Sequence, residues 1–347
     1  MLLNGKNPHG GDIYRNPPRL DFSANINPAG MPDAVKEALV RSVEDCAVYP
    51  DPRCEALREA IAGAEGVPVS FILCGNGSAE LIYQYAWTLA DDGRPALIVH
   101  PAFSEYSAAL RAAGVGEERY VMREEDGFRL TRDILRYEFG RVSAVFLCSP
   151  DNPTGLTVEP KILEDLLRTG ARVFCDLCFL DLTADPGKYD LPRLIREYPN
   201  LTVLRAFTKS CAMAGVRLGY ALSADGDFLG RMAERGQCWN VSTPAQKAGI
   251  AALGCRGWLE SSVKRICSER ERLAREMAAC GIRVVPGEAN FLLMYSDKPV
   301  REELAARGIA LRDCSDYVGL GPGWFRAAVR TREENDELIF HVREVTK

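Results

Sequence analysis

Short apolar runs alternate with longer amphipathic segments along the first two thirds of the chain, and this alternation most constrains the fold. The runs cover residues 96–100, 144–148, 172–175, 202–206 and 218–222. Each is short and is bounded by turn or polar residues, as buried strands are. Helix-like segments lie around and between them, at residues 78–90, 104–113 and 159–169. The pattern predicts an α/β fold of three layers, with helices on both faces of a mostly parallel sheet.

The texture of the sequence changes after residue 243. One long helical pattern, two strand-like runs and a final amphipathic helix follow, the first three at residues 258–279, 290–295 and 309–312. The first thirty residues are rich in Gly, Pro and Asn, which is typical of an extended segment. We therefore predict an N-terminal arm over 1–30, a large domain over 31–243, and a smaller α+β domain over 244–347 with which the arm packs.

Composition limits the classes of partner. The chain has 347 residues and a net charge of −5, which argues against a general nucleic-acid-binding surface. It begins with no basic-then-apolar stretch and contains no apolar run of transmembrane length, so we expect a soluble cytoplasmic protein that does not associate with membranes.

The twelve cysteines are scattered, and several lie in the apolar runs. Free cysteines are often buried, and the cytosol keeps thiols reduced, so no disulfide framework is expected. Cys175 and Cys178 form a CxxC, but no second pair and no histidine cluster accompanies them. We therefore expect no metal site.

Three consecutive apolar runs each deliver a polar residue at or just after their carboxyl end: Asn152, Asp176 and Lys209. Arg217 follows the lysine closely. Each of these residues alone would be unremarkable, since a lysine at a strand end is usually a surface charge. Because ligands bind at the carboxyl ends of parallel strands, their shared placement predicts one site.

These residue types suit pyridoxal phosphate (PLP), an electron sink whose pyridine nitrogen must stay protonated. A buried carboxylate such as Asp176 holds that proton. The Asn152 amide can donate to the phenolic oxygen of the cofactor. The aldehyde needs an amine whose pKa is lowered by burial and by nearby cations, and Lys209 beside Arg217 fits that need.

A small-residue loop at 75–80, Gly-Asn-Gly-Ser-Ala-Glu, precedes a predicted helix. Backbone N–H groups at Gly77, Ser78 and Ala79 could approach a phosphate at the helix N-terminus, which favours negative charge. The loop matches neither the dinucleotide-binding fingerprint nor the P-loop, and by itself it is also an ordinary turn.

Over nearly its whole length the chain resembles the fold-type-I, aspartate-aminotransferase superfamily of PLP enzymes. The run 149–155, Ser-Pro-Asp-Asn-Pro-Thr-Gly, is similar to that family's Asn-Pro-Thr-Gly signature. Lys209 and Arg217 resemble its Schiff-base lysine and its phosphate-binding arginine. The resemblance thus implies PLP as cofactor, with Lys209 as the catalytic residue.

The same resemblance implies further cofactor contacts. Ser78 and the amides around Gly77 would bind the phosphate, with Thr208 near it, and the ring of Phe103 would stack on the pyridine. Tyr49 matches a tyrosine that reaches the phosphate of the neighbouring subunit, which implies a homodimer with shared active sites.

One departure from the family pattern concerns the residues after the aspartate strand. Many relatives have Asp-Glu-Ala-Tyr there, and the tyrosine also bonds the phenolic oxygen. Here the run 176–179 is Asp-Leu-Cys-Phe. Phe179 cannot donate that bond, so Asn152 would carry it more alone.

Two subgroups fit best, histidinol-phosphate aminotransferases and the threonine-phosphate decarboxylases of cobalamin synthesis. The runs 9–11 (His-Gly-Gly), 21–28 (Asp-Phe-Ser-Ala-Asn-Ile-Asn-Pro), 312–315 (Arg-Asp-Cys-Ser) and 325–331 (Phe-Arg-Ala-Ala-Val-Arg-Thr) look decarboxylase-like. Transaminases more often have Asn-Glu-Asn-Pro near the start, and Gly where Arg330 stands. The resemblance assigns substrate binding to His9, Gly10, Asn25, Asn152, Arg312 and Arg326.

Two of these residues are arginines, whose guanidinium groups fork onto carboxylates and phosphates. We expect decarboxylation of O-phospho-L-threonine or O-phospho-L-serine, with transamination of the histidinol-phosphate type as the alternative. The outcome depends on which bond at Cα lies perpendicular to the cofactor, and no motif reports that. A PLP-fold regulatory module and an unrelated α/β enzyme with an incidental Lys209 are more distant alternatives.

Overall fold

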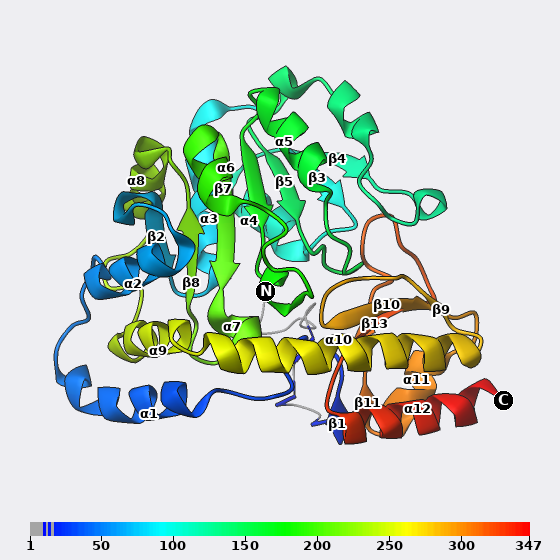
Figure 1. The fold of residues 1–347 in the computed structure, drawn as a ribbon. Helices are drawn as coiled ribbons and strands as arrows, with labels where there is room; N and C mark the ends of the chain where they lie inside the picture. Colours follow the sequence, from blue (N-terminus) through cyan, green and yellow to red (C-terminus); the bar gives the residue numbers. More distant parts are fainter. Residues whose placement is uncertain (1–9, 12, 15–16) are drawn as a thin grey trace.

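A computed structural model describes residues 10–11, 13–14 and 17–347. Its centre is a seven-stranded sheet in the order β2-β8-β7-β6-β5-β3-β4, with only β8 antiparallel to its neighbours (Figure 1). The strands are β2 (Ile72–Gly75), β3 (Ala96–His100), β4 (Glu117–Val121), β5 (Val145–Cys148), β6 (Val173–Asp176), β7 (Leu201–Ala206) and β8 (Gly219–Leu222). The predicted mostly parallel α/β sheet is confirmed.

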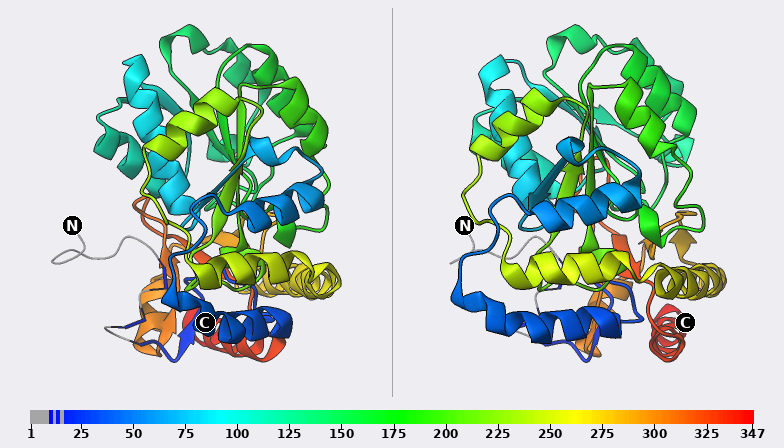
Figure 2. Two further views of the ribbon diagram at one scale, coloured as in Figure 1. Left: turned by 90° about the vertical axis from the view of Figure 1, so that its left-hand side faces the viewer. Right: turned by 60° about the vertical axis from the view of Figure 1, so that its left-hand side comes forward.

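Helices cover both faces of this sheet because its strands are apolar on both sides. Leu97 and Val99 of β3 pack into a core cluster with α2, α5, α6 and α9, whereas Ile98 packs on the other face with α3, α4 and α8 (Figure 2). The helices are α2 (Glu55–Glu65), α3 (Ser78–Leu89), α4 (Ser104–Ala113), α5 (Pro160–Arg168), α6 (Leu191–Glu197), α8 (Gly226–Glu234) and α9 (Thr243–Leu253).

A second, smaller sheet with its own helices lies beside the carboxyl ends of the large sheet (Figure 1). Its four-stranded sheet has the order β12-β13-β10-β9 and is antiparallel throughout. The elements are α10 (Arg256–Ala279), β9 (Arg283–Val284), β10 (Phe291–Tyr295), α11 (Val300–Ala306), β12 (Arg312–Asp313), β13 (Trp324–Ala328) and α12 (Arg332–Thr346).

The strand expected near 309–312 is divided in two. β11 (Ile309–Ala310) pairs in parallel with β1 (Leu20–Asp21), whereas β12 belongs to the four-stranded sheet. Phe22, which follows β1, is buried in the hydrophobic core between the four-stranded sheet and its helices. Residues 20–22 therefore pack against this smaller region, while the arm and the domain bounds stay predictions.

α10 extends along the base of both sheets in Figure 1 and so links the large sheet with the four-stranded sheet. α1 (Asp33–Arg41) packs against α9. The predicted division between the two domains falls at residue 243. Ala245 and Ala248 of α9 follow that residue but belong to the core cluster of the large sheet. The division of the chain at residue 243 stays a prediction.

The remaining elements are short. They are the helical turn α7 (Phe207–Ser210) and the 3-10 helices η1 (Ser42–Ala47), η2 (Val69–Phe71), η3 (Ala90–Asp92), η4 (Glu124–Asp126), η5 (Arg132–Arg136), η6 (Phe139–Arg141) and η7 (Leu180–Leu182). Within the described part of the chain, none of the helices combines the length and apolar composition that a membrane span requires.

Candidate active site

A cavity of about 200 Å³ opens at the carboxyl ends of β5, β6 and β7, between the large sheet, the small domain and the end of the arm. Most of the site residues predicted from the sequence line it. These are Gly10, Asn25, Ser78, Ala79, Phe103, Asn152, Asp176, Thr208, Lys209, Arg217, Arg312 and Arg326.

The sheet register explains why Asn152, Asp176 and Lys209 meet. β5, β6 and β7 are adjacent and parallel, with Cys148 opposite Asp176 and Asp176 opposite Leu204. The strands therefore end at nearly the same level, and the residues that follow them face one space. Lys209 lies in the turn α7 directly after β7.

Asp176 is buried and held from two directions. The Tyr106 hydroxyl donates to Oδ2 at 2.7 Å, and the backbone N–H of Cys178 donates to Oδ1 at 2.9 Å. Burial raises the pKa of this carboxyl group, while the two hydrogen bonds act in the opposite direction. The carboxylate is fixed in place, as a partner for a protonated ring nitrogen must be.

Burial of the Lys209 amine, together with the positive charges of Arg326 and Arg217, lowers its pKa to about 8. Cys178 and Asp176 oppose this shift. A substantial fraction of the amine is therefore neutral near physiological pH, and a neutral amine is the form that attacks a carbonyl carbon.

An anion cradle lies at the N-terminus of α3. Gly77 has a φ of +79°, and a Cβ there would lie 2.5 Å from Nη2 of Arg217, so only glycine lets the guanidinium approach. Arg217 itself has a φ of +61°. A left-handed conformation of a non-glycine residue costs of the order of 1–3 kcal/mol and is typically retained at functional positions. Ser78 and Ala79 begin the helix beside it.

Arg312 and Arg326 face each other across the antiparallel pair β12–β13 and project from the same side of the small sheet. Arg326 donates to Oδ1 of Asn152 and, at 3.0 Å, to the carbonyl oxygen of Ser23. The Asn25 amide, turned so that its oxygen faces Arg326, accepts from Nη1 and Nε at 3.1 Å. The arm, the large domain and the small domain thus converge on one guanidinium.

The arm approaches the cavity closely at Gly10. A Cβ at this position would lie 2.2 Å from the carbonyl oxygen of Ser23, and the next residue, Gly11, donates its N–H to Oγ of Ser23 at 2.8 Å. His9, which was predicted to bind substrate, lies outside the described residues.

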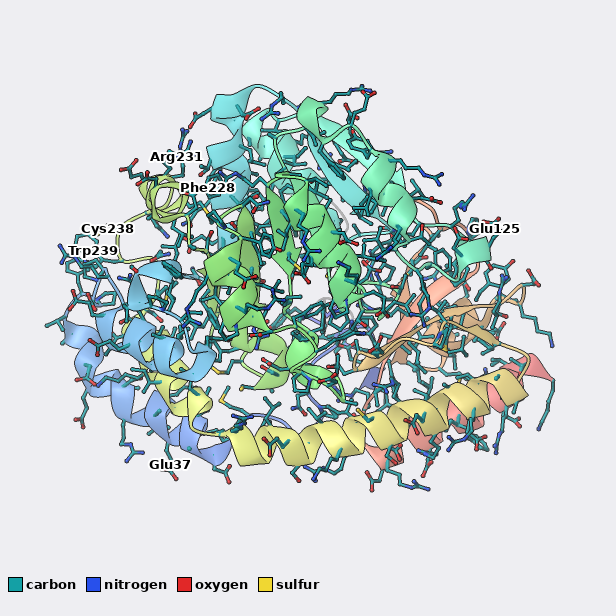
Figure 3. The ribbon with its side chains drawn as sticks, turned by 45° about the horizontal axis from the view of Figure 1, so that its top comes forward. Glu37, Glu125, Phe228, Arg231, Cys238 and Trp239 are labelled. Carbon is teal, nitrogen blue, oxygen red and sulfur yellow. The ribbon has the colours of Figure 1, made fainter. Side chains whose placement is uncertain are left out.

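Two further sequence candidates lie away from the cavity of this chain. Tyr49 is 76% exposed and stacks on Trp239 at a centroid distance of 4.4 Å, at the outer edge of the molecule (Figure 3). Arg330, whose role the sequence left open, pairs with Glu334 at 2.6 Å and lines a separate groove beside α10.

Phe179 lines the cavity, as the departure from the family pattern suggested, and packs edge-to-face on Phe291. It brings no hydroxyl group to the site. Cys178 also lines the cavity; its thiol and that of Cys175 are free, and burial raises both of their pKa values. Among the residues that the structure describes, no cluster of His, Cys, Asp or Glu is placed to hold a metal ion.

Sequence reasoning missed three contacts. Tyr106, the donor to Asp176, carried a weak signal, because it lies one helical turn after Phe103 on α4 and so shares a face with it. Tyr317 lines the cavity with its ring 5.1 Å from the Arg312 guanidinium, and Asp316 pairs with the same arginine. These two lie in an irregular loop, which carries no periodic signal.

Comparison with known proteins defines the class. The model of the family "Aminotransferase class I and II" matches residues 17–342, so the chain belongs to that family. Enzymes of this family depend on PLP, and this chain is therefore a PLP-dependent enzyme.

Three individual proteins show the range of its similarity. The chain is 34% identical to the threonine-phosphate decarboxylase of Salmonella typhimurium, over 94% of this chain and 91% of the relative. It is 32% identical to histidinol-phosphate aminotransferase 2 of Archaeoglobus fulgidus, over 94% and 93%. The crystal structure of the histidinol-phosphate aminotransferase from Clostridium acetobutylicum superposes with a TM-score of 0.89 at 25% identity, covering 94% and 99%.

The residues of the cavity fit PLP. The cradle of Gly77, Ser78 and Arg217 suits its phosphate, and the fixed carboxylate of Asp176 suits its ring nitrogen. Lys209, with its lowered pKa, lines the same cavity and suits its aldehyde.

Proposed function

We propose that this chain decarboxylates O-phospho-L-threonine, or O-phospho-L-serine, to the corresponding amino-alcohol phosphate, as a cytoplasmic enzyme of cobalamin biosynthesis. The observation that carries the proposal is the pair Arg312 and Arg326, which face the cavity of Lys209 from neighbouring strands. Two guanidinium groups suit a substrate with an anionic group at each end. The similarity to the Salmonella decarboxylase supports the finer assignment.

The positions of the two arginines divide the work between them. Arg326 contacts Asn152 and is close enough to lower the pKa of Lys209, so it suits the carboxylate on the reacting Cα. Arg312 is itself buried but pairs with Asp316, whose side chain is 52% exposed, so the ion pair ends at the solvent side of the cavity. Arg312 suits the phosphate at the far end of the substrate.

The bound cofactor supplies an electron sink for the bond that breaks at Cα. Asp176, held by Tyr106, would keep the proton on the ring nitrogen. Arg326 and Asn152 would hold the carboxylate and so orient its bond to Cα for cleavage. After carbon dioxide leaves, Lys209 in its protonated form would donate a proton to Cα as a general acid.

Transamination of the histidinol-phosphate type is the second candidate, and the similarity to the Archaeoglobus and Clostridium proteins favours it. The same Lys209 would then remove a proton from Cα. The choice between the two reactions depends on which bond at Cα the contacts of Arg326 and Asn152 would orient for cleavage.

The test is an assay of the holoenzyme with O-phospho-L-threonine and no keto acid, in which released carbon dioxide and the aminopropanol phosphate are measured. Parallel reactions contain O-phospho-L-serine, or L-histidinol phosphate with 2-oxoglutarate. Release of carbon dioxide without a keto acid supports the proposal. Turnover that requires 2-oxoglutarate and releases no carbon dioxide overturns it in favour of the aminotransferase.

We also propose a homodimer with shared active sites. Large apolar side chains are exposed on one region formed by α1, η1, the following loop and α9, together with Trp239; they are Val40, Val43, Val48, Tyr49, Trp239 and Ile250. An exposed apolar patch of this kind typically marks an interface. Tyr49 lies within it and is available to a partner's site.

Light scattering coupled to size-exclusion chromatography tests the dimer. We expect twice the chain mass for the parent protein and a shift to monomer for Val43→Glu. Phe340→Glu is the matched control, because Phe340 is an exposed apolar residue on α12, away from this region. A parent protein of monomer mass, or equal dimer content in both variants, contradicts the proposal.

A further inference from the structure

The two arginines of the cavity have partners of opposite character. Among the described residues, Arg326 contacts only neutral acceptors, from Asn152, Ser23 and Asn25. Arg312 instead donates from Nη2 to both carboxylate oxygens of Asp316 at 3.2 Å, and from Nη1 to the carbonyl oxygen of Asp313. Within the described part of the chain, Arg326 therefore has neutral partners that an anion could replace, whereas Arg312 already has a carboxylate partner.

The Asp316 carboxylate is placed so that it can leave. Its side chain is 52% exposed, whereas the Arg312 side chain is 10% exposed and is supported by the ring of Tyr317. The arginine is fixed and the carboxylate is half in water. The half-exposed Asp316 carboxylate can turn into solvent when a phosphate takes its place on Arg312, so that the buried guanidinium exchanges one anion for another.

We propose that Asp316 is an internal counter-ion that competes with phosphate for Arg312 and speeds release of the phosphorylated product. The inference rests on the proposed function, in which Arg312 binds the phosphate of the substrate. A phosphate monoester carries close to two negative charges and three acceptor oxygens at neutral pH, so it displaces a single carboxylate.

The need for such a residue follows from the proposed reaction. Decarboxylation removes the group that Arg326 binds, but the phosphate is present on both substrate and product. Binding energy at Arg312 is therefore equal before and after the chemical step, and it slows product release without accelerating that step. When Asp316 returns to Arg312, the product loses its strongest remaining contact with the small domain.

The test is calorimetric titration of the holoenzyme with inorganic phosphate, because the cofactor already fills the other phosphate site. We expect Asp316→Asn to bind phosphate about two- to fivefold more tightly, the range for an ion pair with an exposed partner. Asp316→Glu keeps the charge and should resemble the parent protein. Glu303→Gln removes the same charge from an exposed position of α11 that is not among the residues lining the cavity, and it should change nothing. Arg312→Gln should abolish the binding.

Steady-state kinetics with O-phospho-L-threonine give the second readout. In Asp316→Asn we expect a lower KM and a lower inhibition constant for the amino-alcohol phosphate product. A merely structural loss in the loop would raise both values. Unchanged or weaker phosphate binding in Asp316→Asn overturns the inference. If phosphate binds more tightly but no carbon dioxide is released from any phosphorylated amino acid, the proposed reaction fails while the role of Asp316 stands.

Discussion

The cavity has two walls that are built differently. The wall from the large domain carries Asn152, Asp176 and Lys209 at the ends of adjacent strands, where the backbone of a rigid sheet fixes them. The opposite wall carries Arg312 and Arg326 on short strands and is completed by the arm and by the loop after β12. The first wall suits a resident cofactor, which needs constant geometry. The second suits a substrate, which must enter and leave.

The largest effect is expected on the cofactor wall. Asp176→Ala removes the carboxylate that keeps the ring nitrogen protonated, and we expect kcat to fall at least about 10³-fold, the upper range for loss of one preorganised electrostatic contact. Steady-state kinetics of the holoenzyme measure it. Asp185→Ala, at an exposed position between β6 and α6, is the control. Near-normal kcat in Asp176→Ala would mean that another group holds the ring proton.

Substitutions in the substrate wall should change substrate binding as well as the rate of reaction, and so kcat/KM. Arg326→Gln removes the cation proposed for the carboxylate, and we expect kcat/KM for the phosphorylated amino acid to fall about 10²-fold, as for one partner of a desolvated charge pair. Arg330→Gln, four residues further on, should stay within about twofold, because Arg330 is paired with Glu334 and lines a separate groove. Equal losses in the two variants would refute the distinction between these arginines.

A smaller effect is expected when the hydrogen bond that supports Asp176 is removed and the carboxylate itself is kept. Tyr106→Phe removes the 2.7 Å hydrogen bond to Asp176 and leaves the carboxylate in place. Because hydrogen bonds to charged groups contribute about 1.5–3 kcal/mol, we expect kcat to fall about tenfold with KM little changed. An increase in KM alone would instead place Tyr106 on the substrate side.

The smallest effect is expected on the pH dependence of PLP binding, because Arg326 of the substrate wall shifts the pKa of Lys209 on the cofactor wall. Lys209 has a pKa lowered to about 8, so its amine is protonated below that pH and neutral above it. The rate at which apoenzyme recovers absorbance with added PLP should rise with pH, reach about half its plateau near pH 8, and then level off. In Arg326→Gln the midpoint should move upward, because a cation that lowers the pKa is gone. A midpoint that does not move would mean that the charge of Arg326 does not contribute to the lowered pKa of Lys209.

The two walls also differ in how far the sequence predicted them. Asn152, Asp176 and Lys209 could be placed because the end of a parallel strand is a position that the apolar pattern marks. The pair of Arg312 and Asp316 could not, because it depends on a loop whose path is set by tertiary contacts. The division of residues 309–312 into two strands of different sheets escaped prediction for the same reason. Tyr49 and His9 depend on a partner chain or on undescribed residues, and their roles stay predictions.

The central claim is that Lys209, at the end of β7, carries the cofactor. The most direct measurement is the near-visible absorbance spectrum of the purified protein with added PLP, compared between the parent chain and Lys209→Ala. We expect an absorption band in the parent protein that borohydride treatment traps on the peptide containing Lys209, and no such covalent adduct in the variant. A parent protein that stays colourless with PLP, or a variant that keeps a trapped adduct in the cavity, would contradict the claim.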